Sequence, residues 1–393
     1  MRLQRLAVRN YRALEDVSLG LDELNGFFGP NGAGKSSFLD CLWFVRDCMI
    51  RDVPEAAADR DHGIGVLWDG AEDGASIQIE METDSAIYTV ELHLAQGRID
   101  AQVGERLVAK SSGKELIART SGSSKARFFH GELRQDLDVD LRRPEKLALD
   151  LYLSFSRETP EEAFEIDSLL RYVRFYAART LDLWFLRRRG SESNHHLWLD
   201  ERGRKLWSIL RNLHDRRSYD DRYDRIVDYM REAFPGFRDF EIEQIGPSAV
   251  TCSFREAGRR NPIHASGVSD GHLQLLVLLT ALFSEGRDRR SLVLFDEPET
   301  SLHPHALAVL AKAMREASEN WQKQILVATH SPVLISQFDP NQIVEVSLGE
   351  HRQAIFRRVQ EIEEVRDLLD EYPLGSLYMA EALAPQSAGA IAE

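Results

Sequence analysis

The sequence predicts an α/β fold with an antiparallel β lobe and a helical insertion. Residues 1–30 alternate apolar and polar side chains with the period of a strand, and a glycine-rich turn then leads into a helical pattern. Residues 291–328 read strand–helix–strand, which is typical of a βαβ unit. We therefore expect four parts, namely one half of the core with the β lobe at 1–130, the insertion at 131–238, the other half of the core at 239–345 and a tail at 346–393.

The first half of the chain is predicted to place strands on both sides of one long helix. Residues 36–49 carry their apolar side chains on or near one face, as an amphipathic helix does. Residues 75–108 alternate like antiparallel strands. Residues 109–126 are polar and rich in Ser, Gly and Lys, so we expect a loop there.

The second half begins with a helix whose start is marked by several signals. Thr159 offers a hydroxyl as N-cap, Pro160 suits the first turn, and two glutamates follow at the positive end of the helix dipole. Beyond it we expect a helix at 222–234, strands at 240–245 and 250–254, a strand at 292–295, a helix at 306–317, a strand at 325–328, and a strand pair followed by an acidic helix at 361–371.

Composition restricts the class of protein. With 43% hydrophobic and 29% charged residues, the chain of 393 residues has the make-up of a soluble globular protein. Its 49 basic and 64 acidic residues give a net charge of −15, which argues against general coating of nucleic acid. Three cysteines without a CxxC pair exclude a disulfide framework. The longest apolar run, 273–283, has 11 residues and the N-terminus has no apolar signal core, so we expect a cytoplasmic protein without a membrane segment.

Residues 29–36 match the phosphate-loop pattern G-x-x-x-x-G-K-[ST] between a strand and a helix. Glycines let consecutive backbone N–H groups surround phosphate oxygens, and the helix N-terminus adds partial positive charge. Lys35 supplies a full charge for the β- and γ-phosphates, and the Ser36 hydroxyl can hold Mg²⁺. The sequence thus predicts a nucleoside triphosphate site formed by Gly29, Pro30, Asn31, Gly32, Ala33, Gly34, Lys35, Ser36 and Ser37.

Two further segments carry the chemistry that such a site needs. An apolar strand delivers Asp296 to the edge of the sheet, where its carboxylate can orient the Mg²⁺ shell. Glu297 follows directly and can accept a proton from an attacking water. Ser269 and Gly271 precede a helix that begins at Leu273, and a helix N-terminus suits phosphate. Taken alone, each segment is ambiguous, because apolar runs that end in acids and serine N-caps are common.

The order of these motifs resembles that of ABC-type ATPases. After the phosphate loop come Val-Ser-Asp-Gly-His at 268–272, Asp-Glu-Pro at 296–298, Ser-Leu-His-Pro at 301–304 and Thr-His-Ser-Pro at 329–332. Within that superfamily, Asn-Tyr-Arg at 10–12 and the run at 296–304 resemble the branch of RecF, SMC and OLD ATPases, specifically the bacterial AAA family ATPases. The matching blocks, 1–45 and 262–340, cover about a third of the chain.

The resemblance implies the fold of a P-loop ABC-type ATPase head and a homodimer that sandwiches two ATP molecules with Mg²⁺. It implies that Glu297 and His330 are catalytic, the latter as a switch histidine that contacts the γ-phosphate. It also implies that Arg12 and Asp270 bind nucleotide. In the dimer, Lys35, Ser36, Asp296 and Glu297 of one copy would face Ser269 and Gly271 of the other, and residues 301–303 would communicate between the two sites.

Two positions depart from the pattern. Asp270 and His272 stand where transporter ATPases usually carry glycine and glutamine, a difference that this branch tolerates. The glutamine that would contact Mg²⁺ on the strand after the first helix has no evident counterpart, although residues 68–70, Trp-Asp-Gly, lie at a plausible place.

Several alternatives compete with this interpretation. A transporter ATPase subunit would not need the long stretch between the phosphate loop and Ser269. Metal binding by His303, His305 and His330 competes with the switch role of the last. DNA is a candidate ligand, because residues 171–225 hold 14 basic and 8 acidic residues interleaved with tryptophans, yet these arginines can also pair with acids such as Asp215, Asp220 and Asp224.

The expected function is an ATPase that acts as an ATP-dependent dimeric switch of the RecF/OLD-like class, in DNA repair or anti-phage defence. OLD proteins continue into a Toprim nuclease, for which the 63 residues after His330 are too few, so we expect a nuclease or toxin effector on a separate protein. Residues 369–383 are apolar enough to dock a partner or to pack on the protein's own core. A scaffold that binds ATP without hydrolysing it is the alternative from another class.

Overall fold

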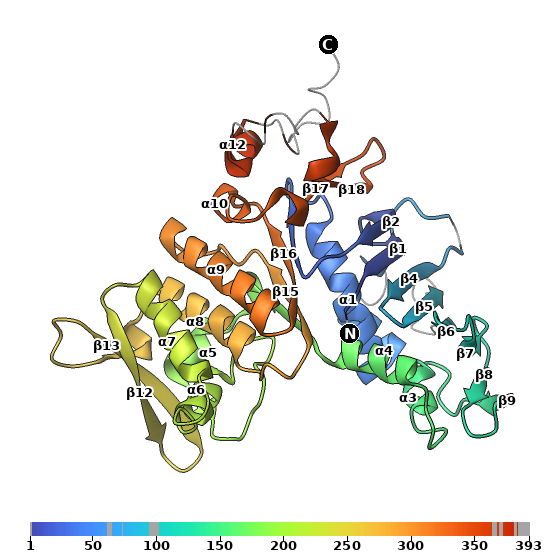
Figure 1. Ribbon diagram of the computed structural model, residues 1–393, viewed down its shortest axis with the longest axis horizontal. Coiled ribbons are helices and arrows are strands. Elements are labelled where there is room, and N and C mark those ends of the chain that lie inside the picture. The colour runs from blue at the N-terminus through green and yellow to red at the C-terminus, as the bar shows by residue number, and fades with distance from the viewer. Residues whose placement is uncertain are drawn as a thin grey trace.

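Three parts are arranged around a central sheet (Figure 1). The computed structural model describes residues 2–60, 65–72, 74–93, 102–363, 368, 372–380 and 383. An antiparallel lobe lies on one side of the central sheet, and helices with a smaller sheet lie on the other. The predicted α/β class with an antiparallel lobe is confirmed. In the part of the chain that is described, no helix is long and apolar enough to cross a membrane.

The central sheet has the strand order β10-β15-β16-β3-β17-β18, in which only β18 is antiparallel to its neighbour. Strands of this kind read as continuous apolar runs because both faces of the sheet are covered. In β15, Leu292 and Leu294 belong to one hydrophobic core, whereas Val293 and Phe295 belong to another on the opposite face. The strands are β3 (Leu24–Phe28), β10 (Val173–Ala177), β15 (Ser291–Asp296), β16 (Lys323–Thr329), β17 (Ile343–Leu348) and β18 (Ala354–Arg358).

Helices cover the two faces of this sheet. On the side of the lobe, α1 (Lys35–Ile50) packs on the sheet together with α4 (Glu161–Arg171). On the other side lie α8 (Asp270–Phe283) and α9 (Pro304–Asn320). The predicted βαβ unit is confirmed as β15, α9 and β16, and the helix predicted at 36–49 is α1.

The lobe is an eight-stranded antiparallel sheet in the order β2-β1-β4-β5-β6-β7-β8-β9. The expected loop at 109–126 is wrong, because β7 places Leu116 and Ile117 in the core while the Ser, Gly and Lys residues form the turns on either side. The division expected at residue 131 runs through this sheet, since β8 and β9 pair across it. The strands are β1 (Arg5–Tyr11), β2 (Leu14–Gly20), β4 (Ile77–Glu82), β5 (Ala86–His93), β6 (Gln102–Ala109), β7 (Glu115–Arg119), β8 (Lys125–His130) and β9 (Gln135–Asp140).

Helices and a small antiparallel sheet surround α8 on the far side of the molecule (Figure 1). The strand β10 falls within 131–238 but belongs to the central sheet. At the start of α4, the Thr159 hydroxyl donates to the Ser156 carbonyl and Pro160 is the N-cap residue, so the predicted hydroxyl cap is wrong. The elements are α5 (Leu183–Arg188), β11 (Ser191–Glu192), α6 (Leu206–His214), α7 (Arg222–Ala233), β12 (Phe237–Ile245), β13 (Ala249–Glu256) and β14 (Ile263–His264), while α2 (Val53–Ala58) and α3 (Leu149–Tyr152) lie near α1 and α4.

The described part of the tail packs on the protein itself. Helix α12 (Leu374–Met379) contacts α10 (Pro332–Ile335) and buries Leu374 and Leu377, and the Tyr378 ring meets Phe28 edge-on. Packing on the core therefore accounts for these apolar residues, whereas Met379 stays exposed. Most of the predicted acidic helix at 361–371 lies outside the described residues.

Candidate functional site

The phosphate loop connects the end of β3 to the start of α1 and requires glycine at two positions. Gly29 has a φ of 152°, and a Cβ there would lie 1.9 Å from the Val346 carbonyl oxygen. Gly34 is the N-cap residue of α1 with a φ of 105°, and a Cβ there would lie 2.7 Å from the Ala354 side chain. Gly32 has a φ of 78°, and a Cβ there would meet no other atom within 4 Å. The loop is thus held close to β17 and β18 while its tip stays open, as a phosphate cradle requires.

Lys35 is buried inside this loop. Its ammonium donates to the Gly29 and Pro30 carbonyls at 2.7 and 2.9 Å. Burial lowers the pKa of the lysine, while the nearby carboxylates of Glu297, Asp296 and Glu299 oppose the shift. The Lys35 ammonium therefore lies near the carboxylates at the end of β15 and just beyond it, where a triphosphate would lie if it bound the loop.

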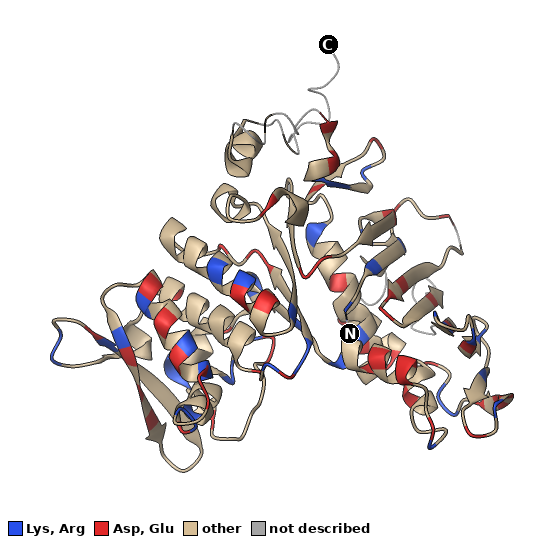
Figure 2. Ribbon diagram, in the orientation of Figure 1, with Lys and Arg blue, Asp and Glu red and all other residues tan. Residues whose placement is uncertain are grey.

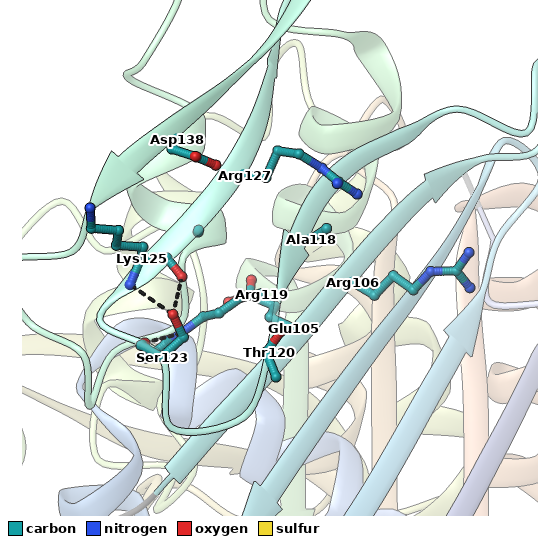
Figure 3. A pocket seen from close by; sticks show the side chains of 10 residues that line it. Glu105, Arg106, Ala118, Arg119, Thr120, Ser123, Lys125, Arg127 and Asp138 are labelled. Carbon is teal, nitrogen blue, oxygen red and sulfur yellow. Dashed lines mark hydrogen bonds between the residues drawn. The ribbon is translucent and has the colours of Figure 1, made fainter.

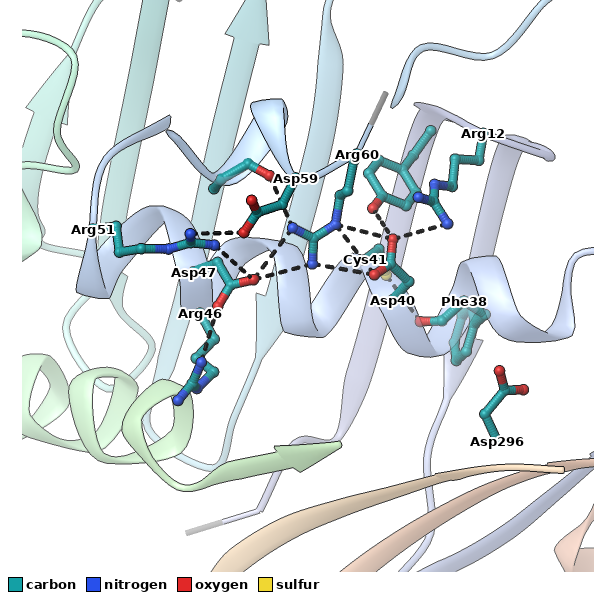
Figure 4. Close-up of polar contacts among 12 residues, drawn as sticks. Arg12, Phe38, Asp40, Cys41, Arg46, Asp47, Arg51, Asp59, Arg60 and Asp296 are labelled. Atoms are coloured by element: carbon teal, nitrogen blue, oxygen red, sulfur yellow. Dashed lines mark hydrogen bonds and ion pairs between the residues drawn. The ribbon is translucent and has the colours of Figure 1, made fainter. Parts of the chain in front are cut away.

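Ser36 and Asp296 meet directly, although they are far apart in the sequence. The Ser36 hydroxyl donates to Asp296 Oδ1 at 2.7 Å, and the Asp296 side chain is only 3% exposed. Burial raises the pKa of this carboxyl, and the Ser36 hydrogen bond and the charge of Arg179 act against that shift. Figure 4 shows Asp296 beside the Phe38 end of α1. A hydroxyl and a carboxylate in this arrangement match the donor set that holds Mg²⁺ beside phosphates.

Glu297, Glu299 and His330 gather at the ends of β15 and β16 because these parallel strands pair Asp296 with Ala328. His330 Nδ1 lies 3.9 Å from Glu297 Oε1, and Nε2 lies 3.7 Å from Glu299 Oε1. The same Glu299 oxygen accepts the His330 backbone N–H at 2.9 Å. Within the described residues, His330 Nδ1 and Glu299 Oε2 are buried without a hydrogen-bond partner. Unsatisfied buried atoms at such an edge, next to an open phosphate loop, fit a site built for a polar ligand.

The alternative in which His303, His305 and His330 bind a metal gains no support from the described residues. The His305 ring contacts the Glu232 carbonyl at 2.9 Å instead of approaching His330. No group of three or more His, Cys, Asp or Glu side chains in the described part of the chain could hold a metal ion.

Residues 269–271 lie at the start of α8. Ser269 is the N-cap, and its hydroxyl oxygen accepts the His272 N–H. Asp270 pairs with Arg187 at 2.5 Å. A Cβ on Gly271 would lie 2.6 Å from the Ser301 carbonyl oxygen, so glycine permits this close approach. No hydrogen bond or ion pair of the described chain joins these residues to 29–37.

Arg12 is tied to α1 through a network of charges (Figure 4). Its guanidinium pairs with Asp40 at 3.1 Å, and the same carboxylate accepts the Tyr11 hydroxyl at 2.5 Å. Arg60 joins Asp40 to Asp47 further along the helix. This network fixes β1 against the helix that follows the phosphate loop, and it gives Arg12 a structural partner in addition to its predicted place beside the nucleotide.

Sequence reasoning left the Mg²⁺-contacting position after the first helix open and did not single out three residues that lie near the candidate site. The backbone N–H of Trp68 donates to Asn10 O next to the lobe, whereas the central strand that follows α1 in sequence is β10, which ends beside Asp296. Arg179 follows β10, so its place depended on strand order and carried no local signal. Glu299 was visible in the Asp-Glu-Pro-Glu run, and Gln274, whose amide donates to the Pro298 carbonyl at 3.1 Å, joins α8 to that turn.

The basic segment at 171–225 is partly neutralised by ion pairs among the described residues. Figure 2 shows acidic and basic residues interleaved along α7 and α9. Trp207 is buried, while Trp184 and Trp198 are exposed. The pairs include Arg174 with Glu285, Arg187 with Asp270, Arg204 with Asp182, Arg222 with Asp220 and Arg225 with Glu316.

A separate hollow of about 420 Å³ lies on the lobe (Figure 3). Arg106 pairs there with Glu115, and Arg119 donates to the Ser123 and Lys146 carbonyls. Because these groups serve the lobe itself and the hollow lies on another sheet, it is not part of the nucleotide site.

Comparisons with known proteins bear on the family and the fold. The AAA_21 family, "AAA domain, putative AbiEii toxin, Type IV TA system", matches residues 24–336. The OLD nuclease of Thermus scotoductus is 21% identical over 392 residues, which are 96% of this chain and 68% of that protein. Endonuclease GajA of Bacillus cereus is 22% identical over 371 residues, which are 88% of this chain and 58% of that protein. RecF of Bacteroides thetaiotaomicron is 45% identical over 55 residues, 14% of this chain and 15% of that protein.

Two solved SMC heads share the fold. One, bound to the C-winged helix domain of ScpA, gives a TM-score of 0.54 at 14% identity and covers 92% of this chain and 99% of its own. The other, with an extended coiled coil and bound to the C-terminal domain of ScpA derived from Pyrococcus furiosus, gives 0.51 at 13% identity and covers 94% and 98%. With a family match over more than half of its length and this fold, the chain belongs to the AAA_21 family, within the RecF, SMC and OLD-like branch of ABC-type ATPases.

Proposed function

We propose that this protein binds and hydrolyses ATP and works as a switch, in which two copies close around two ATP molecules and reopen after hydrolysis. The observation that supports it best is the convergence of Lys35, Ser36, Asp296, Glu297 and His330 at one edge of the central sheet. These residues come from the ends of three adjacent parallel strands, where ligands of open α/β sheets bind.

The roles follow from the chemistry of the side chains. Ser36 and Asp296 would hold Mg²⁺, which supplies positive charge to the phosphate oxygens when it is bound. Lys35 would exchange its two carbonyl partners for phosphate oxygens. Glu297 would accept the proton of the attacking water, and such assistance typically contributes about 10²–10⁴-fold in rate. His330, held by Glu299, would orient toward the γ-phosphate.

Closure of two copies would complete each site with the N-terminus of α8 from the partner. Among the described residues, no hydrogen bond or ion pair joins 269–271 to 29–37 of the same chain, which supports this arrangement. The N-terminus of α8, capped by Ser269, is suited to bind the phosphate oxygens of a triphosphate that sits in the loop of the other copy.

We further propose that the switch controls a nuclease or toxin effector on a separate protein, in DNA repair or anti-phage defence. Two of the curated relatives are named as nucleases and another as a replication and repair protein, which supports that setting. The pairing of arginines with acids in 171–225 gives no support to DNA as a direct ligand of that segment. Mass spectrometry of proteins that co-purify with the ATP-trapped form would test the proposal, and recovery of the chain alone from its native host would contradict it.

The ATPase proposal is tested by comparing wild type with Glu297→Gln. We expect slow phosphate release by the wild type, a loss of about 10²-fold or more in the variant, and an ATP-dependent dimer of the variant in size-exclusion chromatography. Lys35→Ala is the control that removes nucleotide binding, so it should show neither phosphate release nor the ATP-dependent dimer. Equal background release by wild type and Glu297→Gln, with nucleotide still bound, would favour a non-hydrolysing scaffold.

A further inference from the structure

Arg179 reaches the candidate Mg²⁺ carboxylate from a neighbouring strand. The parallel pairing of β10 with β15 sets Ala177 opposite Asp296, so the residues that follow both strands share one edge of the sheet. Arg179 follows two positions later, in a 3₁₀ turn at 178–180, and its Nη2 lies 3.6 Å from Asp296 Oδ2. The Ser36 hydroxyl donates a hydrogen bond to the other carboxylate oxygen, Oδ1. Both oxygens of Asp296 therefore have a partner within the chain.

The two members of this ion pair differ strongly in exposure. Asp296 is 3% exposed, whereas the Arg179 side chain is 70% exposed and can move without disturbing the core. The ammonium of Lys35 is bound to loop carbonyls, so Arg179 is the cation within ion-pair distance of Asp296 in the described chain. It makes no second ion pair among those residues. Among the described residues, Arg179 therefore has one ion-pair partner, and that partner is the carboxylate that Mg²⁺ would bind.

We propose that Arg179 is an anion-binding residue of the nucleotide site, which neutralises Asp296 before nucleotide binds and turns to a phosphate oxygen when Mg²⁺ takes that carboxylate. This inference rests on the proposed function. Its physical reason is that Mg²⁺ at Asp296 would repel the guanidinium while the phosphate oxygens attract it, and the planar fork of arginine suits phosphate. The resemblance implies a glutamine on the strand after the first helix, and its neutral side chain could not offset the charge of Asp296 as Arg179 does.

The proposal makes two predictions of opposite sign. Without Mg²⁺, Arg179 stays paired with Asp296 and offsets its negative charge, so Arg179→Gln leaves that charge to repel the triphosphate and should weaken binding of N-methylanthraniloyl-ATP in EDTA by roughly tenfold or more. With Mg²⁺, the same variant should reach half-maximal nucleotide binding at a lower Mg²⁺ concentration, because no cation competes for Asp296. Arg179→Lys keeps the charge and should retain most of the metal-free binding.

Fluorescence titrations of the full-length protein at fixed ionic strength would measure both effects. Arg189→Gln is the matched control, since it removes an equal charge from an exposed position ten residues along the chain. Unchanged metal-free affinity and an unchanged Mg²⁺ requirement in Arg179→Gln, with tight binding by wild type, would overturn this inference alone. Absence of binding by wild type would instead overturn the proposed function.

Discussion

Glu297 and Ser301 adopt left-handed backbone conformations, with φ angles of 53° and 63°. Such angles are unfavourable for residues other than glycine and tend to occur at functional sites. Close by, His330 Nδ1 and Glu299 Oε2 are buried without partners, and Asp296 carries charge in a buried place. The site thus gives up stability in the absence of ligand, which is the usual cost of a preformed polar site.

Replacing Asp296 by asparagine should therefore stabilise the protein without nucleotide. Burial raises the pKa of Asp296 above its ordinary 3.8, so its contribution to stability is complete only below that pH and is lost as the pH rises through the folded value. At pH 7 in EDTA, we expect Asp296→Asn to unfold at a higher temperature, by the equivalent of about 0.5–2 kcal/mol. Its advantage should shrink as the pH falls toward 3.8. Asp16→Asn, at an exposed carboxylate of β2, should change little, and a lower Tm for Asp296→Asn would contradict the prediction.

At this scale the sequence was informative where chemistry depends on local spacing. Lys35 and Ser36 begin the helix after the phosphate loop, and Asp296 and Glu297 stand at the end of β15, so local spacing fixes where these side chains go. Arg179 could not be found in that way, because its role depends on which strand lies beside β15.

Helix α8 is anchored to the core at both ends. At its start, Asp270 pairs with Arg187. Just beyond its end, Glu285 pairs with Arg174 of β10 and Lys323 of β16 at 2.7 and 3.2 Å, and all three side chains are buried. Because removal of one member leaves a buried charge unpaired, this triad holds the helix to two strands of the central sheet.

Glu285→Gln should cost about 3–5 kcal/mol of unfolding free energy in urea titrations at pH 7. Burial disfavours the charged carboxylate, but Arg174 and Lys323 outweigh it and lower the pKa of Glu285 below its ordinary 4.5. The carboxylate therefore stabilises above that pH, and the difference between variant and wild type should diminish as the pH falls below 4.5. Asp221→Asn breaks the exposed pair with Arg287 and should cost less than about 1 kcal/mol. Similar costs for the two variants would show that the triad does not anchor the helix.

Elements with a strong hydrophobic periodicity were predictable from the sequence, whereas strands that are recognised only by their pairing with other strands were not. Helices α1, α7 and α9 show amphipathic or apolar patterns over three or more turns. Strands β7 and β8 are short and polar on one side, so their turns dominated the composition of 109–126. The run Val173–Ala177 contains a buried arginine, whose partners Glu285 and Lys323 lie far along the chain.

In the whole molecule, the lobe and the helical side are attached to the central sheet by different contacts (Figure 1). The lobe is joined to α1 through Tyr11, Asp40 and Arg60, while α8 is joined to β10 and β16 through Glu285. The phosphate loop is held against β17 and β18, whereas the N-terminus of α8 is held by Arg187 and lies against the carbonyl of Ser301. In the proposed dimer, the N-terminus of α8 from a second copy related by two-fold symmetry would complete the site at each phosphate loop.

Mixing two inactive variants tests this arrangement. Lys35→Ala removes the phosphate loop's charge, and Ser269→Arg blocks the N-terminus of α8, so each variant alone should release no phosphate above background. In a mixed dimer, the intact loop of one chain meets the intact α8 of the other, which restores one site of two. Equal amounts should recover up to about a quarter of wild-type release per chain, because about half of random two-fold dimers are mixed. A double variant carrying both changes, mixed with either single variant, should recover nothing. If loop and α8 instead acted within one chain, no mixture of the single variants would recover activity.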